Sequence, residues 1–235
     1  MSADLTAGAS ATDPGDDAVH LRRMTRLYDG QPAVAHIQLR VERGENVWLR
    51  GTNGSGKSTL LRVIATAISP TFGEGTVLGY DLRRERRQIR ARVDLLGHQS
   101  RLYDDLTAIE NLRFTCALYG LAERSAGSAL DRVGLGDVAD VRAASFSQGM
   151  RQRLALARCL MRGPALILLD EPYAGLDVHA RVLVDDVLAD ARDHGRTVIL
   201  ASHEAPPEAL VGREVHLDAG RVVQSIEDSP VRMRP

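Results

Sequence analysis

Apolar and polar side chains alternate along much of residues 21–41. In the clearest run, apolar residues occupy every second position, at Ala35, Ile37, Leu39 and Val41. A period of two places the apolar set on one face of a strand and the polar set on the other. We therefore expect β-strands here, in a sheet with one buried face and one face in water.

Three later stretches are apolar without alternation. Such runs are typical of central parallel strands that helices cover on both faces. They lie at 93–97, 164–169 and 197–201, and a further short strand is predicted at 45–50. Amphipathic helical patterns begin near residue 59 and near residue 178. This alternation of strands and helices predicts an α/β fold with a largely parallel core sheet.

Helical signals interrupt this order between about residues 100 and 148. Thr107 and Glu110 form a capping box ahead of an apolar run, and a second helix is predicted at about 122–133. Ser147 is well placed as the N-cap of the helix that follows. We expect the helices before Ser147 to form an inserted α-helical subdomain.

Less regular structure is predicted between the first helix and the strand at 93–97. Ser69–Gly75 is rich in turn residues, and Thr76–Tyr80 is interpreted as a short strand. The arginine-rich run at 83–92 could be a phosphate- or lipid-binding patch or the solvated face of a helix. Because Glu85 and Gln88 interrupt it, the pattern favours the solvated face.

Composition narrows the class of protein. The chain has 235 residues, a formal net charge of −1 and two cysteines, Cys116 and Cys159. The near-zero charge argues against a protein held to nucleic acid by bulk charge, and the cysteine spacing predicts buried, reduced thiols. No apolar run approaches the thickness of a bilayer. We expect 1–18 to be a disordered leader and 226–235 a flexible tail.

Residues 51–59, Gly-Thr-Asn-Gly-Ser-Gly-Lys-Ser-Thr, contain the complete P-loop pattern between a predicted strand and a predicted helix. The glycines let successive N–H groups point at an anion, and the helix N-terminus adds partial positive charge. We expect Lys57 to reach the β- and γ-phosphates of a nucleoside triphosphate and Ser58 to hold Mg²⁺. The other residues expected to contact the nucleotide are Asn53, Gly54, Ser55, Gly56 and Thr59. A glycine-rich turn with a chance Lys-Ser is the alternative, and the strand–loop–helix context disfavours it.

Polar residues follow three of the predicted parallel strands, where open α/β sheets bind ligands. They are Gln99, the pair Asp170 and Glu171, and His203. An apolar strand that ends in Asp is the Walker B pattern, so we expect Asp170 to hold Mg²⁺ through its water shell. Glu171 is the natural group to polarise an attacking water. A single histidine is more often structural, but its place beside the other two groups favours a role for His203.

Taken together, these motifs resemble those of the nucleotide-binding subunit of an ABC transporter, over about 19–225. Tyr28 matches the A-loop and Gln99 the Q-loop, while 51–59 match Walker A. Phe146–Met150 resembles the signature motif, although it departs from Leu-Ser-Gly-Gly-Gln at three of five positions. The later matches are Asp170 and Glu171 to Walker B and the catalytic glutamate, Ala174–Asp177 to the D-loop, and His203 to the H-loop.

The resemblance implies a P-loop NTPase (RecA-like) core sheet with an antiparallel β subdomain and an α-helical subdomain. It implies ATP and Mg²⁺ as cofactors, with the adenine stacked on Tyr28 and the γ-phosphate contacted by His203. Gln99 would sense Mg²⁺ and the γ-phosphate, and Asp177 would line the nucleotide site.

The implied partners are a second ATPase subunit, in a homodimer or heterodimer, and separate transmembrane permease subunits. ATP would lie between Lys57 of one subunit and Ser147 and Gly149 of the other. The protein would sit peripherally at the cytoplasmic face of the inner membrane, and no nucleic acid partner is expected.

The motifs identify the subfamily less specifically than the family. Leu96–Gln99 and the following Leu102–Phe114 resemble the haem-exporter ATPase of cytochrome c maturation. Exporters of drugs, lipids or polysaccharides share the segment Leu-Thr-x-x-Glu-Asn-Leu within this stretch. A soluble ABC-type ATPase that acts on ribosomes or DNA is a further alternative, and so is a P-loop kinase or GTPase. Ser147, Gly149 and His203 argue against the kinase or GTPase.

Overall fold

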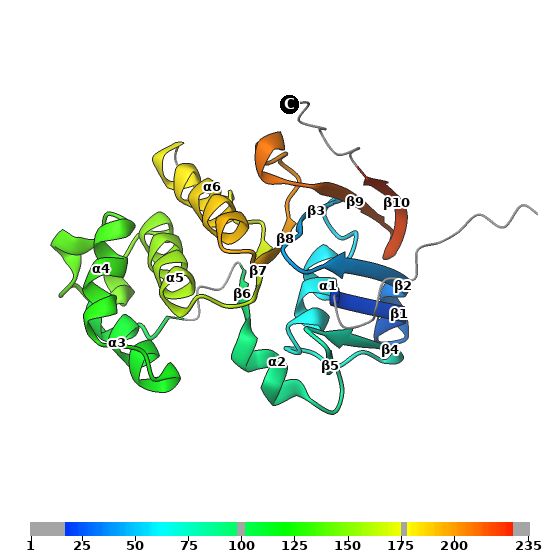
Figure 1. Cartoon of the computed structure of the whole chain (residues 1–235), viewed down its shortest axis with the longest axis horizontal. Helices are drawn as coiled ribbons and strands as arrows, with labels where there is room; N and C mark the ends of the chain where they lie inside the picture. The colour runs from blue at the N-terminus through cyan, green and yellow to red at the C-terminus, as the bar shows by residue number, and fades with distance from the viewer. Residues whose placement is uncertain (1–16, 98–101, 175–177, 228–235) are drawn as a thin grey trace, which may run out of the picture.

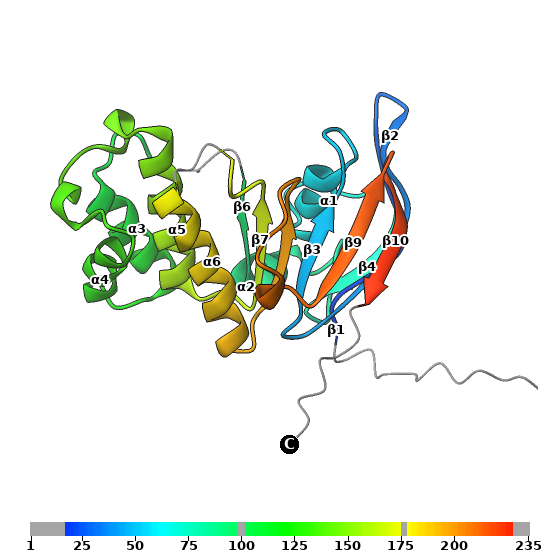
Figure 2. The same cartoon turned by 90° about the horizontal axis from the view of Figure 1, so that it is seen from above.

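The computed structural model describes residues 17–97, 102–174 and 178–227. It contains two sheets and a separate group of helices (Figures 1 and 2). The predicted combination of an antiparallel sheet, a largely parallel sheet and additional helices is therefore present.

The period-two pattern near the N-terminus forms the antiparallel sheet. Its order is β2-β1-β4-β5, with bounds β1 Asp17–Tyr28, β2 Gln31–Glu42, β4 Phe72–Val77 and β5 Tyr80–Asp81. The four alternate apolar residues of β2 are buried, as predicted, whereas His36 and Gln38 between them are exposed.

The apolar runs form the core sheet, of order β10-β9-β3-β8-β7-β6. All pairings in it are parallel except that of β9 with β10. The bounds are β3 Asn46–Arg50, β6 Val93–Leu96, β7 Leu166–Asp170, β8 Thr197–Ala201, β9 Arg213–Asp218 and β10 Arg221–Glu227. Consequently the carboxyl ends of β3, β7 and β8 share one edge of the sheet. The P-loop follows β3 there, Glu171 follows β7 and Ser202 follows β8.

Helices cover both faces of this sheet. Their bounds are α1 Lys57–Ile64, α2 Arg86–Arg92, α3 Ala108–Tyr119, α4 Arg124–Arg132, α5 Gln148–Arg162 and α6 Val178–Asp193. Alternate residues of β7 show the two-sided burial. Leu166 and Leu168 belong to the core that contains α1 and the antiparallel sheet, whereas Ile167 and Leu169 pack with α5 and α6. Each fully buried side chain of this size contributes about 1.5–3 kcal/mol.

The remaining helices form a third core. Leu112 of α3, Leu130 of α4 and Leu154 of α5 are its fully buried centre. The predicted capping box begins α3, since Thr107 accepts from the Glu110 N–H and the Glu110 carboxylate accepts from the Thr107 N–H. In both views this group lies to one side of the core sheet, away from β1 and β2 (Figures 1 and 2).

Two predictions between α1 and β6 are wrong. The supposed turn Ser69–Gly75 contains most of strand β4, because its glycines serve close approach rather than turning. A Cβ on Gly73 would lie 2.5 Å from the Arg23 carbonyl oxygen of β1. The single strand Thr76–Tyr80 is instead divided by a tight turn, in which Leu78 and Gly79 both have positive φ.

Other features agree with expectation. Cys116 and Cys159 are both free and buried, and the exposed arginines of 83–92 lie on and before the short helix α2. Among the described helices, none has the length and apolar character that a membrane span requires.

Candidate nucleotide site

The loop between β3 and α1 is shaped by glycines that no other residue could replace without strain. Gly56 has φ +103°, and a Cβ there would lie 2.4 Å from the Ala33 carbonyl oxygen of β2. The loop is thus pressed against the antiparallel sheet. Helix α1 starts at Lys57 with no side-chain cap, so its first N–H groups are available to an anion.

Lys57 lies inside this loop rather than in solvent, and its side chain is 5% exposed. Its Nζ donates to the carbonyl oxygens of Gly51 and Thr52, at 2.7 and 3.1 Å. The same ammonium is 3.5 Å from Oε1 of Glu171. One cation therefore connects the end of β3 to the end of β7.

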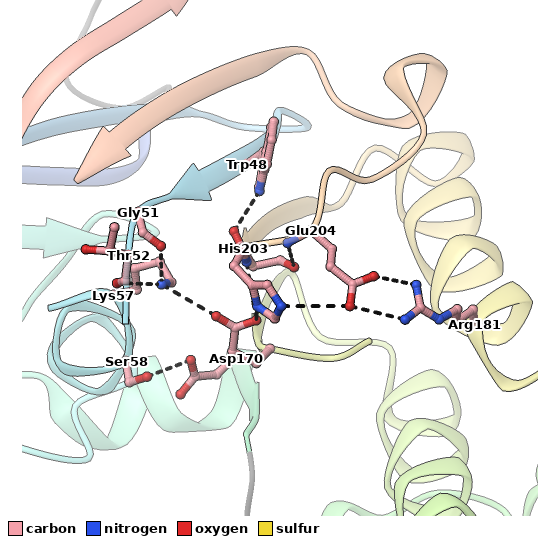
Figure 3. A network of polar contacts seen from close by, with 11 residues as sticks. Trp48, Gly51, Thr52, Lys57, Ser58, Asp170, Arg181, His203 and Glu204 are labelled. Carbon is pink, nitrogen blue, oxygen red and sulfur yellow. Dashed lines mark hydrogen bonds and ion pairs between the residues drawn. The ribbon is translucent and has the colours of Figure 1, made fainter. Parts of the chain in front are cut away.

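Ser58 and Asp170 meet as the sequence predicts. The Ser58 hydroxyl donates to Oδ1 of Asp170 at 2.8 Å (Figure 3). Burial raises the pKa of Asp170, and this effect outweighs the Ser58 hydrogen bond, which lowers it. Ionising this carboxylate is costly unless a cation lies beside it. Together with the Ser58 hydroxyl, the Asp170 carboxylate therefore forms a pair of oxygen ligands suited to hydrated Mg²⁺.

Glu171 and His203 also meet. The Oε2 atom of Glu171 is 2.8 Å from Nδ1 of His203 and accepts from its backbone N–H at 3.3 Å. Glu171 has φ +50°, an uncommon conformation for a residue with a long side chain, and its own N–H donates to the Ala201 carbonyl of β8. The backbone thus turns sharply at the strand end and directs this carboxylate toward Lys57 and His203.

Two buried oxygens show that the site fits a polar ligand. The Ser55 hydroxyl has no hydrogen-bond partner within the described residues, and Oε1 of Glu171 has only the Lys57 ammonium, at the ion-pair distance of 3.5 Å. Buried polar atoms are normally paired, and both lie among the groups already described. Uncapped helix N–H groups, one buried lysine and a hydroxyl–carboxylate pair match a triphosphate with Mg²⁺.

For the other predicted nucleotide-binding residues, the structure shows how exposed each one is rather than a contact with the Lys57 group. Asn53 and Gly54 are exposed in the loop, while Thr59 is half-buried in α1. The ring of Tyr28 is 41% exposed at the end of β1, with the Arg26 guanidinium 4.6 Å from its centroid. It is therefore free on one side to stack with a further ring.

Ser147 and Gly149 do not join this group. Ser147 caps α5 as predicted, accepting from the Met150 N–H at 3.2 Å. No hydrogen bond or ion pair in the described part of the chain links it to Lys57 or Glu171. The predictions for Gln99 and Asp177 lie outside the described residues.

Two charged residues near the site were not predicted. Arg181 of α6 pairs with Glu204, which directly follows His203 (Figure 3). The adjacency of Glu204 to His203 was visible in the sequence, but nothing in the local pattern identified its partner 23 residues earlier.

We expect Asp170→Asn to stabilise the Mg²⁺-free protein. The folded-state pKa of Asp170 is raised above its usual value of 3.8. Its proton-linked stabilisation is complete below that value and is lost as the pH rises through the folded-state pKa. The variant's Tm at neutral pH should therefore exceed the parent's, and the difference should shrink on acidification. Mg²⁺-dependent hydrolysis should fall by about 10²-fold or more.

Asp218→Asn is a suitable control for this effect, because Asp218 is exposed on β9. It should leave both the Tm and the hydrolysis rate unchanged. An Asp170→Asn Tm below that of the parent at neutral pH would contradict the prediction.

Known proteins resemble this chain in sequence and in fold. A model of the ABC transporter family matches residues 34–174. The chain is 34% identical to the ABC transporter ATP-binding protein NatA of Bacillus subtilis over 197 residues, which cover 81% of this chain and 80% of NatA. It is also 34% identical to the daunorubicin/doxorubicin resistance ATP-binding protein DrrA of Streptomyces peucetius, and this match covers 88% of the chain but 64% of DrrA.

A solved structure extends the comparison to three dimensions. The dimeric, post-hydrolysis structure of the ATP-binding cassette MJ0796 with ADP and Pi superposes with a TM-score of 0.82 and 26% identity. The match covers 89% of this chain and 98% of that one. It confirms the predicted P-loop NTPase fold with its antiparallel and helical parts.

The chain belongs to the ABC transporter family, as an ATP-binding subunit. It is an ATPase, and its cofactors are ATP and Mg²⁺.

Proposed function

We propose that this ATPase powers the export of a small molecule of the drug type through separate transmembrane permease subunits. The supporting observation is its similarity to DrrA across 88% of the chain, since that relative is named for daunorubicin and doxorubicin resistance. The chain spans 64% of DrrA, so the proposal concerns the ATPase function and the class of cargo.

We propose that the subunit binds peripherally at the cytoplasmic face of the membrane. Exposed apolar side chains on and before α3 support this docking. Tyr103 and Phe114 are 54% and 44% exposed, and their rings meet edge to face with centroids 4.9 Å apart. Leu118, on the same helix, is 64% exposed. An apolar patch of this kind suits a permease segment better than it suits nucleic acid.

The chemistry follows from the site residues. Lys57 and the N–H groups at the start of α1 would bind and orient the β- and γ-phosphates. Ser58 and Asp170 would hold Mg²⁺, which, when bound, offsets phosphate charge and polarises the terminal phosphoryl group. Glu171 would accept a hydrogen bond from the attacking water, and His203 would hold the Glu171 carboxylate in place and contact the γ-phosphate.

We propose that the active form is a dimer, either of this chain or with a related one. Ser147, the N-cap of α5, is exposed and Gly149 of α5 is half-buried, and among the described residues no hydrogen bond or ion pair links either to Lys57 or Glu171 of its own chain. A γ-phosphate bound by Lys57 could be met by these residues from a second subunit, as the dimeric form of MJ0796 suggests. Gln99 is proposed to sense Mg²⁺ and the γ-phosphate, and Asp177 to line the nucleotide site.

Ser147→Arg should then spare nucleotide binding yet reduce hydrolysis by about 10²-fold or more, because an arginine at the N-cap would obstruct the closed dimer. Equilibrium titration with a fluorescent ATP analogue and steady-state phosphate release measure the two effects. Ser128→Arg, on α4, is a control for surface charge in the same helical group. Normal hydrolysis by Ser147→Arg would refute the shared site.

Haem export is a second candidate, favoured by the resemblance of Leu96–Gln99 and Leu102–Phe114 to the haem-exporter ATPase. Purification of the full chain from native membranes in mild detergent separates the two candidates. A polytopic partner without a Soret band, together with drug-stimulated ATPase activity, supports the drug-type exporter. A polytopic partner with a Soret band supports haem export instead. Absence of any membrane partner would refute both and favour a soluble ATPase.

A further inference from the structure

Glu204 makes a two-point ion pair immediately beside the histidine of the site. Its carboxylate oxygens accept from the two terminal nitrogens of Arg181, at 2.5 and 3.1 Å. Arg181 belongs to α6, so the pair joins this helix to the loop after β8 (Figure 3). Two parallel hydrogen bonds fix the relative orientation of both planar groups, which a single contact does not.

Further contacts hold the same loop and the same arginine. The Arg181 guanidinium lies 5.9 Å from the ring centroid of Tyr173, whose hydroxyl donates to Asp185 at 2.7 Å. On the other side, the Glu204 N–H donates to the Ser202 hydroxyl at 3.0 Å. The segment that carries His203 is therefore fixed on both sides of the histidine.

The histidine itself is weakly held. Its side chain is 56% exposed, and Glu171 is its one hydrogen-bonded side-chain partner among the described residues. Oε1 of Glu204 lies 3.9 Å from the other ring nitrogen, Nε2. If Arg181 did not hold it, this carboxylate could move closer and form a hydrogen bond with Nε2, which would compete with the contact between Nδ1 and Glu171.

We propose that Arg181, acting through Glu204, is a positioning residue for His203. The pair keeps the Glu204 carboxylate at 3.9 Å from Nε2, beyond hydrogen-bond distance, and so leaves the His203 ring held by Glu171. The inference rests on the proposed role of His203 in hydrolysis. Because exposed ion pairs contribute little to stability, loss of this pair should affect the orientation of the ring more than the fold.

Arg181→Ala is expected to lower kcat by about 10-fold or more, since small misplacements of a site group have effects of this size. KM for ATP should change little, because the hydrogen bonds and ring contact found for Arg181 within the described residues involve Glu204 and Tyr173 and none involves the P-loop. Arg181→Lys keeps the charge but loses the two-point geometry, so it should restore kcat in part. Fluorescence of Trp48, the single tryptophan, whose indole donates to the Ser202 carbonyl, verifies that the loop remains folded.

The decisive readout is a double-mutant cycle with His203→Ala, with residual hydrolysis followed by release of radiolabelled phosphate. If Arg181 acts through His203, Arg181→Ala should cause no further loss in the His203→Ala background. Arg132→Ala is the matched control, since Arg132 also pairs with α6, through Asp190 at 3.3 Å, but far from the loop. It should leave kcat unchanged.

The outcomes distinguish the positioning role of Arg181 from the proposed role of His203 in hydrolysis. Loss of hydrolysis in His203→Ala with a normal rate in Arg181→Ala would overturn the positioning role alone. Losses that multiply in the double variant would also overturn it, because Arg181 would then act independently of the ring. A normal rate in His203→Ala would overturn both the role of His203 and the positioning by Arg181.

Discussion

Glu171→Gln is expected to reduce kcat for ATP hydrolysis by about 10³-fold, the contribution typical of a positioned general base. The amide keeps the size of the carboxylate and can still accept from the His203 N–H, so the local geometry should persist. What is lost is the negative charge that polarises water. Lys57 also loses its negatively charged partner, 3.5 Å away, so its charge is no longer offset by Glu171 when phosphate binds.

ATP affinity should therefore be maintained or increased while turnover stops, and an ATP-bound dimer should accumulate. Size-exclusion chromatography with multi-angle light scattering, in Mg²⁺-ATP and in ADP, measures this accumulation. Glu214→Gln is the control, because Glu214 pairs with Arg50 outside the hydrolytic group. Steady-state hydrolysis at the parental rate would exclude Glu171 as the base.

The site could be predicted from the sequence to the extent that its determinants are local. Gly56, Lys57 and Ser58 act through the conformation of one short loop, and the strand before Asp170 carries its own apolar signature. Parallel strands bring their carboxyl ends to one edge, so Glu171 and His203 were expected on the same edge. The structure adds that β7 and β8 are neighbours in the sheet. The structure supplies the distances and the left-handed backbone at Glu171.

What could not be predicted depends on contacts distant in sequence. In the sequence Gly73 resembles a turn residue. In the structure it is required because a Cβ there would lie 2.5 Å from the Arg23 carbonyl oxygen of β1. The Arg181–Glu204 pair forms because α6 packs against the loop after β8, which no periodicity encodes. The cargo is less predictable still, because it is proposed to bind other chains. For this reason the resemblance of Leu96–Gln99 to a haem exporter does not decide the substrate.

Lys57→Ala is expected to weaken ATP binding by about 2–5 kcal/mol, or roughly 30- to 4,000-fold in Kd, the usual cost of truncating one partner of a buried charged contact. The Lys57 ammonium holds the Gly51 and Thr52 carbonyl oxygens and faces Glu171. Its removal leaves the negative charge of Glu171 without its cation partner, with only the His203 contacts remaining, at the place where phosphate charge must bind. Lys57→Met retains an apolar stem, so an equal loss in both variants assigns the effect to charge rather than to packing.

The sequence offers an unusually direct measurement, because Lys57 is the one lysine among its 235 residues. Reductive methylation with ¹³C-formaldehyde would label its Nζ and the terminal amine alone, and the terminal signal is identified in Lys57→Met. The Lys57 methyl signal should shift on addition of Mg²⁺-ATP, and ATP should protect Lys57 from methylation when present beforehand. A signal indifferent to ATP, or unchanged affinity in Lys57→Ala, would show that the buried ammonium between β3 and β7 serves only to hold the loop.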